Sequence, residues 1–186
     1  IVARAAPACA AAEGSDDALA AAARGDPDAF ALLYRRHVDG VFRYCRRRLP
    51  TKEAAEDATT AIFERALGRL DRYRGGSFRA WLFTIAHHAV ADALRVPIHG
   101  QGPLAAGSAM LDLPDPAPLP EDAALTADAA RTLRGVLAQL SPDQQRVVEL
   151  HLAGLNGREI AEVLGRRPDA VRAIQSRALA RLRLLL

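Results

Sequence analysis

The 186-residue sequence lacks several features that mark particular classes of protein. It has only two cysteines, Cys9 and Cys45, which lie far apart and predict neither a disulfide framework nor a zinc site. Its apolar runs are too short to span a membrane, and its alanine-rich start lacks the basic and leucine-rich parts of a signal peptide. We therefore expect a cytoplasmic protein that does not insert into a membrane.

Sequence motifs of catalysis and cofactor binding are absent as well. The phosphate-binding patterns G-x-x-x-x-G-K-[ST] and G-x-G-x-x-G do not occur, and neither does the zinc-binding pattern H-E-x-x-H. His87 and His88 are neighbours, so a helix would point them in different directions, whereas a metal pair needs a spacing of three or four residues. We expect no enzyme activity, no cofactor, no metal ion and no small-molecule substrate.

Strand signals are missing too, since no segment alternates polar and apolar residues with a period of two. The sequence predicts an all-α fold of two small helical domains: a three-to-four-helix bundle, then a four-helix domain with a C-terminal helix-turn-helix. A Pro/Gly-rich linker with six prolines, three glycines and no basic residue joins them. We assign residues 1–25 to a flexible leader, 26–96 to the first domain, 97–120 to the linker and 121–186 to the second domain.

Three long helices are expected in the first domain. They span residues 26–49, 52–70 and 77–95, with Asp26, Thr51 and Ser77 as their respective N-caps. The apolar stripe of the third helix runs from Trp81 to Leu94 and is expected to face inward. The first domain is thus predicted to be a helical bundle.

The stretch 156–186 predicts a helix-turn-helix. Apolar positions form one helical face before Gly165 and a second face after it, which indicates a short helix, a tight turn and a longer helix. Residues 166–186 hold six arginines and one acid, Asp169, an excess that suits the phosphate charge of duplex DNA. We favour a helix that enters the DNA major groove over a plain helical hairpin with a solvated basic face.

Residues 69–81 form a second candidate nucleic-acid surface, because they mix four arginines with Tyr73, Phe78 and Trp81. Arginine neutralises phosphate and an aromatic ring stacks on an exposed base, so this composition is typical of single-strand binding. We favour a core position for Trp81, which falls on the apolar stripe. For Tyr73 and the adjacent Gly75-Gly76 loop we favour a functional role.

The second of these three helices is expected to carry an exposed acidic face. Its members are Glu53, Glu56, Asp57 and Glu64. The face is either simply solvated or a docking surface for a basic partner.

Both blocks, in this order, resemble the extracytoplasmic-function (ECF) sigma factors, small two-domain transcription initiation factors of bacteria. The resemblance rests on DAFALLYRRHVDGVFRYCRRRL, AEDATTAIFERALGRLDRY and SFRAWLFTIAHHAVADALR, and on LSPDQQRVVELHLAGLNGREIAEVLGRRPDAVRAIQSRALARLR in the second block. It implies that the first domain binds polymerase and opens the promoter −10 element, and that the second reads the −35 element as duplex. The implied partners are core RNA polymerase, through its β′ clamp helices and β flap, promoter DNA and an anti-sigma factor.

The resemblance also implies residue roles, matched position by position. The implied −35 residues are Arg167, Asp169, Arg172, Ala173, Gln175, Ser176 and Arg177. The implied −10 residues are Arg72, Tyr73, Arg74, Ser77, Arg79, Thr84, His88 and Arg95. The implied polymerase-contact residues are Asp57, Thr60, Ala61, Ile62, Phe63 and Glu64. Thr60 and Ala61 replace the family's usual Gln and acid, and His88 stands where the family commonly has Asn.

Two other functions remain open at this point. A stand-alone helix-turn-helix regulator would need a dimerisation or effector domain, and the first block offers no ligand motif for one. A degenerate sigma-like protein would act only through protein–protein contacts, and the departures at Thr60, Ala61 and His88 keep this possibility alive.

Overall fold

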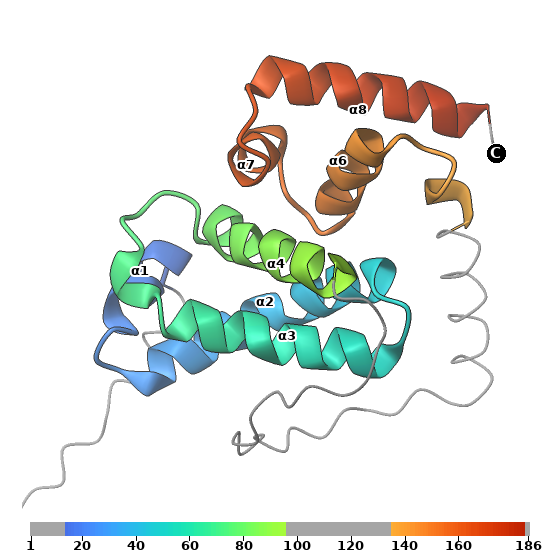
Figure 1. The fold of residues 1–186 in the computed structure, drawn as a ribbon. Coiled ribbons are helices and arrows are strands. Elements are labelled where there is room, and N and C mark those ends of the chain that lie inside the picture. The colour runs from blue at the N-terminus through green and yellow to red at the C-terminus, as the bar shows by residue number, and fades with distance from the viewer. Residues whose placement is uncertain (1–13, 96–134, 185–186) are drawn as a thin grey trace, which may run out of the picture.

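All regular elements are helical in the computed structural model, which describes residues 14–95 and 135–184 (Figure 1). In chain order they are α1 (Asp16–Ala22), α2 (Pro27–Arg48), α3 (Lys52–Leu67), the short 3-10 turn η2 (Leu70–Arg72), α4 (Phe78–Arg95), α6 (Pro142–Leu152), α7 (Gly157–Val163) and α8 (Pro168–Arg183). The predicted all-α class is confirmed. The linker at 97–120, the leader up to residue 13 and most of the helix expected before residue 140 lie outside the described residues.

Polar side chains cap the helices where the sequence indicated. The Asp26 carboxylate accepts a hydrogen bond from the Asp28 amide at 3.0 Å, with proline in the first turn, and Thr51 caps α3. Ser141 begins α6 through a capping box, in which its side chain and that of Gln144 satisfy each other's backbone amides. Local chemistry thus determines where these helices begin.

The N-terminal bundle is built from α2, α3 and α4, with α1 packed across one end (Figure 1). Leu33, Val41 and Ile62 are fully buried between these helices. The inward stripe expected on α4 is correct up to Val90, but Leu94 is 50% exposed. Leu94 lies in the last turn of α4, where the described residues leave it half uncovered.

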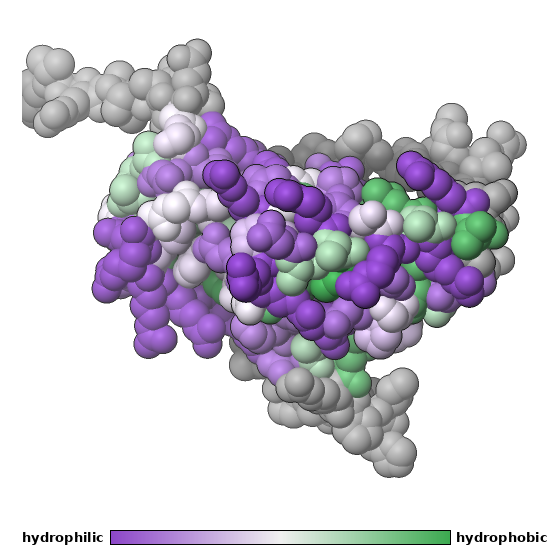
Figure 2. All heavy atoms as spheres, turned by 90° about the horizontal axis from the view of Figure 1, so that it is seen from above, coloured by the Kyte–Doolittle hydropathy of each residue, from purple (hydrophilic) through white to green (hydrophobic). Residues whose placement is uncertain are grey.

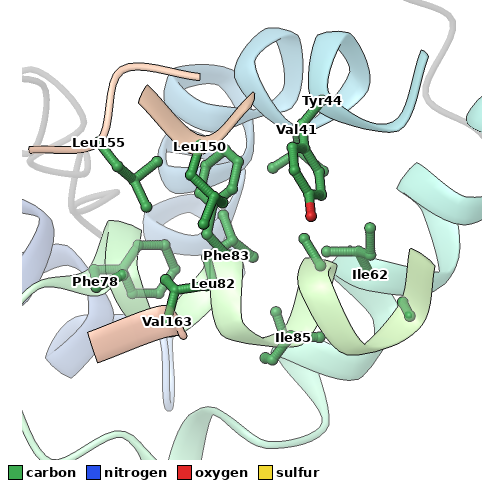
Figure 3. Packing of buried hydrophobic residues seen from close by; sticks show 14 of the residues in the cluster. Val41, Tyr44, Ile62, Phe78, Leu82, Phe83, Ile85, Leu150, Leu155 and Val163 are labelled. Carbon is green, nitrogen blue, oxygen red and sulfur yellow. The ribbon is translucent and has the colours of Figure 1, made fainter. Parts of the chain in front are cut away.

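The two domains share one hydrophobic core. Helix α4 packs against α7 and α2 against α6, so side chains of the C-terminal helices join the core of the bundle. Figure 3 shows Leu150, Leu155 and Val163 pointing toward Phe78 and Leu82 of α4. The orientation of the second domain is therefore set by apolar contact with the first.

Within the two described ranges, no helix is long and apolar enough to cross a lipid bilayer.

Replacing Leu82 with alanine should lower the free energy of unfolding by about 2–5 kcal/mol, because a fully buried leucine is deleted and a cavity remains. Leu179→Ala, at a leucine that is 47% exposed on α8, is the matched control and should cost less than about 1 kcal/mol. Urea denaturation followed by circular dichroism measures both. Equal losses would contradict the placement of Leu82 in the core.

Candidate nucleic-acid and polymerase interfaces

Helices α7 and α8 form the predicted helix-turn-helix. The Asn156 side chain accepts hydrogen bonds from the Arg158 and Glu159 amides, and the Glu159 carboxylate accepts from the Asn156 amide, so a capping box begins α7. Gly165 ends the helix with φ of +59°, a conformation that glycine adopts without strain. Arg166 then bonds the Asp143 carboxylate at 2.8 Å, which ties the turn to the start of α6.

Helix α8 has one buried and one exposed face. Val171, Ile174 and Ala178 are buried and pack the helix against the rest of the domain. The seven residues that the resemblance assigns to the −35 element lie on the other side of α8. Six of them are exposed, and Gln175 is half-buried. Figure 2, which views the molecule from the α8 side, shows this face as largely hydrophilic.

The exposed face of α8 meets the start of α7 at a shallow depression of about 490 Å³. Its lining is Asn156, Gly157, Arg158, Pro168, Arg172 and Gln175. Arg172 is 82% exposed and its nearest acid, Asp169, lies 3.8 Å away, so the guanidinium is available to a ligand. Arginine and amide side chains on a rigid exposed helix are the groups that contact base edges and phosphates in duplex DNA.

Helix α3 carries an exposed polar face. Asp57, Thr60 and Glu64 are exposed on it and Ala61 is half-buried. The other two residues implied for the polymerase contact are not accessible: Ile62 is fully buried and Phe63 is 4% exposed. The Phe63 ring lies 4.7 Å from that of Tyr34. Ile62 and Phe63 hold α3 on the bundle, and the fully exposed residues of the implied contact set are polar.

The loop between α3 and α4 is built around a buried tyrosine. Tyr73, for which we favoured a functional role, is 4% exposed, and its ring packs 5.6 Å from that of Phe78 and 5.4 Å from that of Trp81. Its hydroxyl donates to the Asp17 carboxylate, and burial and that carboxylate raise its pKa. Helix α1 covers this end of the bundle, and the sequence holds no signal that pairs Asp17 with Tyr73. Trp81 is half-buried against the core, as favoured.

Of the other residues that the resemblance assigns to the −10 element, some are exposed and others form hydrogen bonds within the protein. Arg72, Arg74 and His88 are exposed, Thr84 bonds back to the Ala80 carbonyl, and Arg95 ends α4. Ser77 caps α4 and also donates to the Glu159 carboxylate of α7 at 2.6 Å. The guanidinium of Arg79 donates to the Gly154 carbonyl at 2.9 Å. Both residues therefore contact the second domain.

A charged contact at the end of α2 was not foreseen from the sequence. Arg48 donates to the Glu149 carboxylate of α6 at 2.7 Å, and the two side chains are 15% and 7% exposed. Burial raises the pKa of the Glu149 carboxyl, and the hydrogen bond from Arg48 opposes that shift. The run Arg46-Arg47-Arg48 indicated only a helix end, because nothing in a single sequence connects it with an acid a hundred residues away.

Family comparisons agree with this architecture. Residues 33–96 match the model of Sigma-70 region 2, and residues 130–182 match that of Sigma-70, region 4. The ECF RNA polymerase sigma factor ShbA of Streptomyces griseus is 36% identical over 173 residues, which cover 88% of this chain and 91% of ShbA. The chain belongs to the ECF sigma factors of the sigma-70 family.

Other ECF sigma factors show the same range of similarity. BldN of Streptomyces coelicolor is 38% identical over 165 residues, and this chain spans 62% of its length. SigD of Mycobacterium tuberculosis is 32% identical over 178 residues, or 83% of SigD. The similarity to these sigma factors extends over 87% and 92% of the present chain.

Solved structures share the fold. CnrH, in complex with the cytosolic domain of CnrY, has a TM-score of 0.70 at 25% identity, covering 92% of this chain and 97% of CnrH. RpoE from Bartonella quintana, in complex with the anti-sigma factor NepR, has a TM-score of 0.59 at 21% identity over 84% of this chain and 95% of RpoE. The second similarity concerns the fold alone.

His87 should make this sigma factor less stable at acid pH. Burial lowers its pKa to about 4, aided by the cations Arg48 and Arg146, while the unfolded side chain titrates near about 6.5. Between these two pH values the unfolded state binds more protons than the folded state. The contribution of neutral His87 to the free energy of unfolding is therefore complete above about pH 6.5 and is lost as the pH falls toward about 4. The melting temperature of His87→Gln should therefore fall less over this range.

His88→Gln is the matched control, because His88 is the exposed neighbour. Its melting temperature should follow that of the wild type as the pH falls. Parallel pH profiles for His87→Gln and the wild type would contradict the role of His87.

Proposed function

We propose that this ECF sigma factor binds core RNA polymerase through α3 and directs it to promoters through two DNA-reading surfaces, α8 for the −35 duplex and the start of α4 for the −10 element. The observation that carries the proposal is the amphipathic division of α8. Its apolar residues are used for packing, while its polar residues, including Arg172, remain accessible. A helix divided in this way presents a preformed surface to the major groove.

Reading of the −35 element is assigned to the exposed face of α8. Arg172, Gln175 and Ser176 are the proposed contacts to base edges, and Arg167 and Arg177, which are exposed, are the proposed contacts to phosphates. Asp169 lies in the first turn of α8, 3.8 Å from the Arg172 guanidinium. Ala173 leaves room for a base to approach the helix.

Capture of unstacked −10 bases is assigned to the loop before α4 and to the exposed side of α4. The glycines at 75 and 76 have φ of +92° and +100°, which gives the loop a shape that other residues rarely adopt. Arg72 and Arg74 flank Tyr73 and are exposed to a phosphate backbone. Ser77, Arg79, Thr84, His88 and Arg95 complete the candidate −10 surface.

Polymerase binding is assigned to the acidic face of α3, with Asp57, Thr60 and Glu64 as its accessible polar residues. The β′ clamp helices are the proposed partner of this face, and the β flap that of the second domain. An anti-sigma factor is a further proposed partner, since the similar fold of RpoE was solved with the anti-sigma factor NepR.

In vitro transcription tests the proposed function. Core polymerase, with and without the chain, is given fragments of genomic DNA, and RNA 5′ ends are mapped. We expect new start sites that share upstream motifs, and a holoenzyme on gel filtration. The absence of both would contradict the proposal, and DNA binding without polymerase would favour a stand-alone regulator.

Arg172→Ala should reduce transcription from these start sites about tenfold or more, because a good contact to a base is worth about 1–3 kcal/mol. Holoenzyme formation should not change, since Arg172 lies away from α3. Arg181→Ala is the control: it removes the same charge from an exposed position near the other end of α8. If both variants lose transcription equally, Arg172 contributes only general charge.

A further inference from the structure

Helix α1 precedes the segment that matches Sigma-70 region 2, because that match begins at residue 33. It packs against α2 and α4, and its Leu19 and Ala20 are buried in the core of the first domain. A helix of seven residues is not stable by itself in water, since the first turn is costly to form. Contacts with the bundle therefore hold α1 in place.

The first turn of α1 is fastened to α2 by Asp16. Its carboxylate accepts a hydrogen bond from the Arg36 guanidinium at 2.9 Å and lies 2.7 Å from Nε2 of His37. The His37 side chain is nearly buried, and its ring lies 5.5 Å from that of Phe78, the first residue of α4. Asp16 thus fixes α1 close to the start of α4.

Two residues of the α1 segment, one near each end, contact Tyr73 in the loop before α4. Asp17, in the first turn of α1, accepts a hydrogen bond from the Tyr73 hydroxyl. Arg24, which follows the helix, donates to the Tyr73 backbone carbonyl at 2.6 Å. The side chain and the backbone of Tyr73 are therefore held separately.

The loop before α4 has little packing of its own to define its shape. Among the described residues, a Cβ built on Gly75 or Gly76 would meet no atom within 4 Å beyond its chain neighbours. Glycine has more accessible backbone conformations than other residues, so two unpacked glycines destabilise any single loop shape. The Tyr73 hydroxyl also lies 3.0 Å from the Gly76 carbonyl oxygen. Holding Tyr73 therefore restrains the path of both glycines.

We propose that Asp17 and Arg24 are positioning residues for −10 capture, and that through Tyr73 they hold the loop before α4 in the shape that receives an unstacked base. The inference rests on the proposed function and adds two residues that precede the region 2 match. A loop that is ordered before its ligand arrives loses less conformational entropy on binding. Asp17 is an anion that would repel a phosphate backbone, which agrees with a role through Tyr73 and not through contact with DNA.

Holoenzyme binding to a single-stranded oligonucleotide tests the proposal. The oligonucleotide carries the −10 motif of the start sites that the wild-type chain directs, and its affinity is measured by fluorescence anisotropy. Asp17→Ala and Arg24→Ala should each weaken binding about fivefold, the size expected when one hydrogen bond is lost. Permanganate reactivity of promoter thymines, which reports unpaired bases, should fall in parallel. Affinity for core polymerase should not change, since neither residue lies on α3.

Two further variants distinguish positioning from general stabilisation of the bundle. Asp17→Asn keeps an oxygen that can accept the Tyr73 hydroxyl proton, so it should restore binding to within about twofold of the wild type. Tyr73→Phe removes the hydroxyl and keeps the ring. Combined with Asp17→Ala, it should cause no more loss than the larger of the two single changes, because both remove one hydrogen bond. Additive losses would contradict the proposed link between Asp17 and Tyr73.

Asp39→Ala and Arg35→Ala are the matched controls, since they remove the same charges from exposed positions on α2. Both should bind the oligonucleotide as the wild type does, at a temperature at which circular dichroism shows every variant folded. Wild-type affinity in Asp17→Ala and Arg24→Ala would overturn the proposal. So would a loss of core polymerase affinity in step with the loss of DNA binding, because α1 would then only stabilise the bundle. If the wild-type chain directs no transcription, the proposed function itself fails and the inference falls with it.

Discussion

The packing of α4 against two sets of helices is the contact on which the rest of the structure depends. One side of α4 completes the bundle with α2 and α3, and its N-terminal part packs against α7. Because α7 also packs on α8, the position of the helix-turn-helix relative to the bundle follows from this apolar contact. Apolar burial is non-directional, so the polar bonds of Ser77, Arg79 and Arg48 are needed to define the orientation.

Among the described residues, arginines occur in three different environments, which are distinguished by burial and by the acid that each one contacts. Arg172 is exposed and available to DNA, Arg166 is held by Asp143 at the turn of the helix-turn-helix, and Arg48 is nearly buried against Glu149. The chain as a whole has a formal net charge of only +3, so its overall charge provides little attraction to DNA. Under the proposed function, specificity comes from where the individual guanidinium groups lie, and polymerase delivers the chain to DNA.

The parts of the fold that depend on local chemistry could be predicted from the sequence. Capping residues such as Asp26 and Ser141, the helical stripes and the turn at Gly165 act over a few neighbouring residues, so a single sequence is enough to place them. The hydrogen bond of Tyr73 to Asp17 could not be predicted, because the two residues lie more than fifty positions apart. The pairs Ser77–Glu159 and Arg48–Glu149 were missed for the same reason, since Ser77, Glu159 and Arg48 each have a sufficient local role at a helix cap or helix end.

The missed contacts change how the two DNA-reading surfaces relate to each other. Sequence reasoning treats them as equivalent modules on a linker, whereas in the structure α8 is accessible and the start of α4 is partly occupied. Under the proposed function, duplex DNA is read at α8 while the contacts between the two domains stay in place. Capture of unstacked −10 bases costs a few kcal/mol, roughly, and exchanges the protein partners of Ser77 and Arg79 for DNA.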